Sequence, residues 1–263
     1  MPSFVRANGR LHHYVQHAGT QGRAVVFINS LGTDLRIWDE VIERLPTNVP
    51  VLSYDKSGHG LSGPGAASIE DFAADLASLM DALDMGNALV CGVSVGGMIA
   101  QALADIRPDL VAGLVLCNTG YRIGTAESWS DRIIALDKGG IEPMADAVLE
   151  RWFSPWFRQN RPELLAGYQM MLTRTPLAGY RAVCQAIRDA NLESRARLVA
   201  CPTLCIAGEA DLATPPDVVN SLADAIPCAL SECYAGVGHL PCIERPDEQL
   251  ELMDAFFREN DLG

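Results

Sequence analysis

Short runs of apolar residues alternate along the chain with longer segments in which apolar residues recur every three or four positions. The runs are typical of strands buried on both faces of a sheet, and the recurring spacing is typical of amphipathic helices. This alternation predicts an α/β fold whose mostly parallel central sheet is flanked by helices. After an N-terminal hairpin, the expected strands are residues 24–28, 49–54, 89–93, 113–118, 203–207 and 229–234.

Turn and capping signals predict where several elements begin. Asn8-Gly9 favours a two-residue turn and predicts a hairpin over residues 5–16. Ser68-x-x-Asp71 is a capping box and predicts the start of a helix. Helical spacing predicts further helices at residues 38–45, 218–226 and 250–257.

Residues 119–190 follow a different pattern, because they carry helical periodicity and no convincing strand. Prolines at positions 143, 155, 162 and 176 divide this segment into short helices. We therefore expect a helical lid, residues 119–190, inserted into a core domain formed by residues 1–118 and 191–263.

Composition and charge narrow the classes of partner. The 263 residues are 49% hydrophobic, which is ample for a sizeable core, and no apolar stretch approaches the roughly 20 residues of a membrane span. The formal net charge of −13 argues against nucleic acid and anionic membranes as partners. No basic and apolar leader opens the sequence, so we expect a cytoplasmic location. The sequence does not decide between a monomer and a homo-oligomer.

The eight cysteines do not read as a disulfide framework. Cys91, Cys117 and Cys205 lie in or beside apolar runs, where reduced cysteine behaves as a small hydrophobic residue. The spacings Cys201-x-x-x-Cys205 and Cys228 to Cys233 lack the paired pattern and nearby histidines of a zinc site. We expect no metal.

A candidate nucleophile stands between two apolar runs, in Gly92-Val93-Ser94-Val95-Gly96. In the pattern G-x-S-x-G the serine occupies a turn between strand and helix that is too tight for any residue but glycine two positions away. The turn lifts the hydroxyl above the end of the strand. We therefore predict Ser94 as a nucleophile.

A serine nucleophile needs a base and an acid behind the base. His239 follows the last expected strand, at the edge of the sheet where the carboxyl ends of parallel strands meet, and is the predicted general base. Asp211 follows the strand before it and is preferred as the acid over Glu209, which lies too close to Gly208. The remaining histidines are expected to be structural; they are His12, His13, His17 and His59.

The chain resembles the α/β-hydrolase fold over its whole length, in the order Ser94, Asp211, His239, in the tight strand-to-helix turn (the nucleophile elbow) at Ser94, and in the helical lid. Several stretches of the sequence, including stretches in the lid, are similar to the 3-oxoadipate enol-lactonase branch of that fold. They are Asn29 to Asp34, Leu116 to Thr119, Arg122-Ile123-Gly124, Ala147 to Phe153, Gly179-Tyr180 and Cys184-x-Ala186-Ile187. Asp55-Lys56-Ser57-Gly58 departs from the branch, where arginine usually precedes the glycine.

An oxyanion hole needs two backbone N–H donors, one of them from the residue after the nucleophile, here Val95. The second is expected in the loop after the strand 24–28. Many relatives carry His-Gly there, whereas this chain has Asn29-Ser30, so Leu31 is the predicted donor.

The resemblance implies a carboxylic-ester hydrolase that needs no cofactor. Its substrate would be a small anionic enol-lactone formed in the breakdown of aromatic acids. Ser94 would open the ring through an acyl-enzyme, and water would release 3-oxoadipate.

An anionic substrate needs positive charge near the site. The segment 119–190 holds nine Lys and Arg against eight acids, while the remainder carries about −14. We expect at least one arginine to bind the substrate carboxylate, with Arg122 first and Arg132 next. Trp129 and Trp152 are further candidates for the pocket wall, although packing between lid and core is the simpler interpretation.

Three alternatives remain open from the sequence. A broad carboxylesterase or a cofactor-free haloperoxidase-like hydrolase would share the same three residues. A small-molecule receptor could use the same fold without turnover. A structural or interaction protein has no supporting feature beyond the cysteines.

Overall fold

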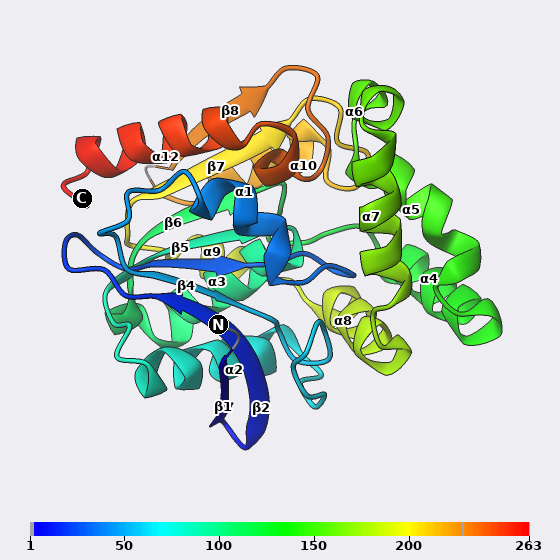
Figure 1. Cartoon of the computed structure of the whole chain (residues 1–263), viewed down its shortest axis with the longest axis horizontal. Helices are drawn as coiled ribbons and strands as arrows, with labels where there is room; N and C mark the ends of the chain where they lie inside the picture. Colours follow the sequence, from blue (N-terminus) through cyan, green and yellow to red (C-terminus); the bar gives the residue numbers. More distant parts are fainter. Residues whose placement is uncertain (1–2, 228, 263) are drawn as a thin grey trace.

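The computed structural model describes residues 3–227 and 229–262, so Cys228 lies outside the described residues. Its strands form one sheet in the order β1-β2-β4-β3-β5-β6-β7-β8 (Figure 1). The strands are β1 (Ser3–Ala7), β2 (Arg10–His17), β3 (Val25–Ile28), β4 (Val51–Tyr54), β5 (Ala88–Val93), β6 (Val111–Cys117), β7 (Thr203–Gly208) and β8 (Leu230–Tyr234).

The sheet is parallel from β4 to β8, and only its N-terminal hairpin breaks the pattern. β2 pairs antiparallel with both β1 and β4. Asn8 and Gly9 have φ angles of 50° and 75°, the left-handed pair that a two-residue turn requires, so the predicted hairpin is confirmed. Strands β3 to β7 are buried on both faces almost throughout, as their continuous apolar runs predict.

Two groups of mutually contacting helices cover the sheet. One group is α2, α3, α9 and α10, and the other is α1, α11 and α12. The predicted α/β-hydrolase architecture, a mostly parallel sheet flanked by helices, is confirmed. These helices are α1 (Asp39–Ile42), α2 (Ile69–Ala82), α3 (Val95–Ile106), α9 (Glu193–Ala196), α10 (Pro216–Ala225), α11 (Pro241–Glu244) and α12 (Pro246–Glu259).

Helix starts follow the local signals more closely than the spacing of apolar residues. The Ser68 hydroxyl accepts from the Asp71 amide and the Asp71 carboxylate accepts from the Ser68 amide, so the predicted capping box is present. Helices α10 and α12 begin earlier than predicted, at Pro216 and Pro246, because proline is preorganised for the first helical position.

The region around Trp38 is not the single helix that its spacing predicts. A 3-10 turn, η1 (Leu35–Trp38), leads into the single turn of α1. The Asp34 carboxylate accepts from the Arg36 amide, and the Asp55 carboxylate accepts from the Leu35 amide. Side chains therefore satisfy the N–H groups at the start of this turn.

Residues 119–190, between β6 and α9, form helices and no strand. Figure 1 shows these helices gathered at one end of the sheet. They are α4 (Ala126–Gly139), α5 (Ala145–Trp152), α6 (Pro155–Asn160), α7 (Pro162–Thr173) and α8 (Leu177–Asp189). We keep the name lid for residues 119–190; that these residues behave as a separate unit stays a prediction.

The seven cysteines of the described residues are all free thiols, and five of them are buried. The same residues contain no cluster of His, Cys, Asp and Glu that could hold a metal ion. None of the described helices is long and apolar enough to cross a membrane.

Candidate active site

Ser94 lies at the turn between β5 and α3 with φ 59° and ψ −123°, a conformation that non-glycine residues rarely adopt. A side chain at Gly96 would place its Cβ 2.4 Å from the Ile28 carbonyl oxygen, and one at Gly92 would come equally close to the backbone of Gly96. Glycine is therefore required on both sides of the serine. This is the elbow geometry that the pattern G-x-S-x-G predicts.

The backbone of Ser94 is held on both sides while its hydroxyl is left free. Its amide donates to the Cys117 carbonyl at 3.0 Å, and the Thr119 hydroxyl donates to its carbonyl at 2.7 Å. Within the described residues the Ser94 hydroxyl makes no hydrogen bond. The strained turn is thus braced by β6, and its oxygen is available to a substrate.

Asp211 and His239 are brought together at the ends of β7 and β8. Asp211 Oδ2 and His239 Nδ1 are 2.8 Å apart, and each residue is only 2% exposed. A carboxylate accepts, so the proton of this bond is on Nδ1, and Nε2 is left as an acceptor. Asp211 also accepts from the amides of Ala213 and Thr214 and from the Thr214 hydroxyl.

Asn118 is a site residue that the sequence did not single out. It directly follows β6 with a φ of 43°; its Oδ1 accepts from the Gly208 amide at 2.7 Å, and its Nδ2 donates to the Gly238 carbonyl at 2.9 Å. The side chain thereby joins the loops that carry Asp211 and His239. Its place directly after a central strand was the available signal, since site residues gather at such strand ends.

A cavity of about 130 Å³ lies beside Ser94 and His239. Ser94 and His239 line it from the core, and α4 and α5 of the lid close it. The other lining residues are Ser30, Leu31, Ile123, Gly124, Ser128, Trp129, Arg132, Val148, Arg151, Trp152 and Ala213. In the described chain no hydrogen bond joins Ser94 to His239, although both face the same small space.

The two predicted oxyanion donors lie in suitable places. Leu31 lines the cavity, and within the described residues its amide donates to no other group. Val95 is the first residue of α3, where an N–H has no acceptor inside the helix. Both residues are buried, so solvent competes little for these amides.

The structure changes the order of the candidate arginines. Arg122, the first choice from the sequence, is exposed and does not line the cavity. Arg132 does, with its guanidinium 5.3 Å from the centre of the Trp129 ring. Arg151 also lines it and was missed. Its place on α5 beside Val148 carried no signal in the sequence, because helical spacing does not indicate what a helix face will meet.

Arg132 and Arg151 also line an outer hollow of about 630 Å³ that shares Val148 with the cavity. Neither guanidinium takes part in an ion pair with another described residue, whereas most arginines of the chain do. These two arginines, without an ion pair among the described residues, therefore line both the outer hollow and the cavity that contains Ser94. Trp129 and Trp152 line the inner cavity, which is the role that the sequence analysis considered less simple than packing between lid and core.

The remaining candidates lie outside the cavity. His13 Nδ1 bonds the Asp55 carboxylate at 2.7 Å, and His59 Nε2 accepts from the Gly32 amide at 3.1 Å. His12 is buried in β2 and His17 ends that strand. Glu209, the rival acid, is exposed and accepts from the Gly236 amide instead of from His239.

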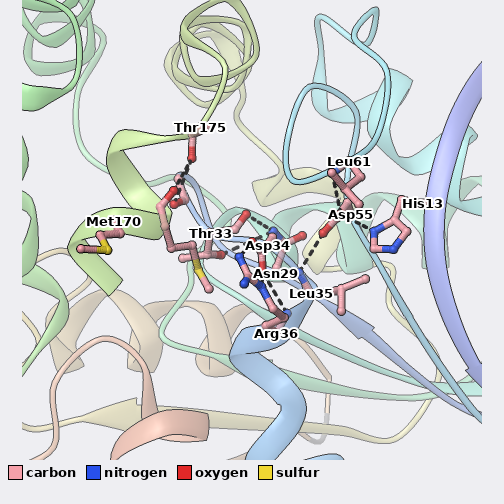
Figure 2. A network of polar contacts seen from close by, with 12 residues as sticks. His13, Asn29, Thr33, Asp34, Leu35, Arg36, Asp55, Leu61, Met170 and Thr175 are labelled. Atoms are coloured by element: carbon pink, nitrogen blue, oxygen red, sulfur yellow. Dashed lines mark hydrogen bonds and ion pairs between the residues drawn. The ribbon is translucent and has the colours of Figure 1, made fainter. Parts of the chain in front are cut away.

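A larger hollow, of about 850 Å³, lies between α7 and the loops after β3 and β4. Figure 2 shows the polar network beside it, in which Asp55 holds His13 and the amides of Leu35 and Leu61. Neither Ser94 nor His239 lines this hollow. Size alone therefore does not mark the reactive site.

Known proteins share the sequence pattern and the fold of this chain over most of its length. The family described as "Alpha/beta hydrolase family" matches residues 25–252. The 3-oxoadipate enol-lactonase 2 of Acinetobacter baylyi is 33% identical over 193 residues, covering 73% of this chain and 72% of that protein. The crystal structure of the enol-lactonase from Burkholderia xenovorans LB400 superposes with a TM-score of 0.93 at 34% identity, covering 97% of this chain and 100% of that one. The putative non-heme bromoperoxidase BpoC of Mycobacterium tuberculosis is 29% identical over 246 residues, or 90% and 94% of the two chains.

Proposed function

Because the chain belongs to the alpha/beta hydrolase family, we propose that it hydrolyses 3-oxoadipate enol-lactone to 3-oxoadipate through an acyl-enzyme on Ser94. The observation that carries the proposal is the small cavity in which Ser94 and His239 face two unpaired arginines. A volume of about 130 Å³ suits a small molecule, and the arginines suit an anion. Such a substrate belongs to the breakdown of aromatic acids.

In the first half of the reaction, Ser94 Oγ attacks the lactone carbonyl while His239 Nε2 accepts the hydroxyl proton. Asp211 keeps the other ring nitrogen protonated and stabilises the imidazolium. The amides of Leu31 and Val95 receive the negative charge of the tetrahedral intermediate. Collapse of that intermediate breaks the ring C–O bond, and His239 returns its proton to the departing oxygen.

The second half releases the product. The departing oxygen is that of an enol, which relaxes to a ketone and thereby makes ring opening hard to reverse. Water, activated by His239, then attacks the ester on Ser94 and frees 3-oxoadipate. Apart from the substrate and water, each step uses only side chains and backbone amides of this chain.

A cofactor-free haloperoxidase-like hydrolase or a broad carboxylesterase is the alternative, favoured by the similarity to the bromoperoxidase BpoC. The proposals are separated by following the loss of the enol-lactone's ultraviolet absorbance beside the cleavage of neutral aryl esters. We expect kcat/KM for the enol-lactone to exceed that for the esters by at least about a hundredfold. If a folded protein turns over the lactone slowly and cleaves the esters well, the lactonase proposal is contradicted and the carboxylesterase is favoured.

Arg132 and Arg151 should bind the substrate carboxylate. Replacing either by alanine is expected to lower kcat/KM for the anionic lactone by about 10- to 100-fold, the value of a hydrogen bond to a charged group. A neutral aryl ester should be cleaved almost as before. Arg6→Ala removes the same charge from an exposed position on β1 and serves as the control. Equal losses on lactone and ester would contradict a carboxylate clamp.

A further inference from the structure

Lys56, one of only two lysines in the chain, is completely buried directly after β4 and has no part in the proposed chemistry. Its Nζ donates to the carbonyl oxygen of Ser30. Burial of an ammonium group is costly even when the group is hydrogen-bonded. An apolar side chain of similar length would fill the same space at lower cost, so the position calls for a functional explanation.

The carbonyl that Lys56 holds belongs to the same peptide unit as the amide of Leu31. No described peptide bond is cis, and in a trans unit the C=O and N–H point in opposite directions. The Lys56 ammonium therefore lies on the carbonyl side of the Ser30–Leu31 peptide, and the Leu31 N–H points away from it. Leu31 lines the cavity with Ser94 and His239.

Neighbouring groups anchor the peptide units on both sides of Leu31. The Thr33 hydroxyl donates to the Ser30 carbonyl at 2.9 Å, and His59 Nε2 accepts from the Gly32 amide at 3.1 Å. From the lid, the Thr175 hydroxyl donates to the Gly32 carbonyl at 3.3 Å. Figure 2 shows Thr175, Thr33 and Asn29 around this loop. The loop that carries Leu31 is thus preorganised by core and lid together.

Since Thr33 already satisfies the Ser30 carbonyl, the contribution of Lys56 is its charge and its alignment of the peptide. A cation on a carbonyl oxygen polarises the amide and makes its N–H a stronger donor. Preorganised dipoles of this kind have their largest effect where negative charge develops in a water-poor site.

We propose that Lys56 is a positioning residue of the oxyanion hole, which aligns and polarises the Ser30–Leu31 peptide so that the Leu31 amide stabilises the tetrahedral intermediate. The proposal rests on the proposed serine chemistry but is independent of which ester or lactone is the substrate. It also accounts for a buried cation that packing alone does not require.

The charged groups near Lys56 are Asp34, in the loop after β3, and Asp55, in the loop after β4. Burial lowers the pKa of Lys56 from 10.5 to about 7, against the opposing effect of Asp55 and Asp34. Burial and the nearby Lys56 charge keep the pKa of His59 well below its usual value, so that ring stays neutral and can accept from Gly32. Lys56 loses its ammonium proton near pH 7 in the folded chain and near pH 10.5 in the unfolded chain. Its burial therefore lowers the free energy of unfolding most below pH 7. This destabilisation decreases as the pH rises from 7 towards 10.5.

The test is Lys56→Met, assayed with a neutral aryl ester. We expect kcat to fall by about 10- to 100-fold, somewhat less than the loss of a whole oxyanion donor, with KM little changed. The affinity for phenylboronic acid, which forms a tetrahedral adduct with a serine, should fall by a similar factor. At pH 6 the variant should melt at a temperature equal to or above that of the wild type, and this advantage should shrink as pH rises from 7 to 10.

Lys138→Met, on the exposed face of α4, removes the same charge and is the matched control. A purely structural Lys56 would give the opposite result, a lower Tm with kcat reduced only as far as the protein unfolds. A folded Lys56→Met variant with kcat within twofold of wild type overturns the proposal. If that variant does not fold, Lys56→Gln is measured by the same criteria. Ser94→Ala in the same series reports separately on the proposed serine chemistry.

Discussion

Ser94→Ala is expected to lower turnover of lactone and ester alike by roughly a millionfold, because it removes the oxygen that attacks the carbonyl. The remaining rate would come from the oxyanion hole and from substrate binding. The measurement is the loss of enol-lactone absorbance at high protein concentration, together with a search by mass spectrometry for an acyl-enzyme, which should form on the wild type alone.

The fold of this variant should be unchanged. The Ser94 hydroxyl has no partner among the described residues, and alanine is no more strained than serine at φ 59°. The free energy of unfolding should therefore stay within about 0.5 kcal/mol of wild type. Ser130→Ala, at a half-buried position of α4 that does not line the cavity, controls for handling and purity. A folded Ser94→Ala variant within tenfold of wild-type activity would rule out Ser94 as the nucleophile.

Asp211→Asn should lower kcat by about ten-thousandfold with little change in fold. The asparagine amide would donate to His239 Nδ1, where the carboxylate now accepts, and would leave the proton on Nε2. The histidine could then no longer accept the proton of Ser94. The amides of Ala213 and Thr214 would still find an acceptor in the asparagine oxygen. The measurement is kcat on the lactone beside thermal unfolding.

Glu209→Gln is the matched control, since Glu209 is the rival acid and its amide analogue keeps an acceptor for Gly236. It should retain activity close to that of the wild type. If Glu209→Gln lost more activity than Asp211→Asn, the acid of the site would have been misassigned.

Much of this site could be predicted because the fold is regular. Parallel strands bring their carboxyl ends to one edge of the sheet, so Ser94, Asp211 and His239 could be assigned to one place from their positions after successive strands. The tight turn at Ser94 could also be predicted from the sequence, since only glycine permits the close approach of residue 96 to the Ile28 backbone. The resemblance to α/β-hydrolases and to their enol-lactonase branch is confirmed by the comparisons.

The arginines were less predictable, because their places depend on how the lid packs on the core. Arg122 follows a strand end closely, yet it does not line the cavity, whereas Arg151, which is also exposed, lines it from α5. Helical periodicity indicates which face of a helix is apolar. It does not indicate which part of the core that face will meet.

The sequence by itself determined the α/β-hydrolase fold, the strained serine turn and the order of the three predicted catalytic residues, because each follows from local backbone preferences and from the direction of parallel strands. Only the tertiary structure decided that Asn118 joins the acid and histidine loops, that Arg151 instead of Arg122 lines the cavity beside Arg132, and that Lys56 lies behind Leu31. Those relations join residues far apart in the chain, and they arise from side-chain packing, which no local pattern encodes.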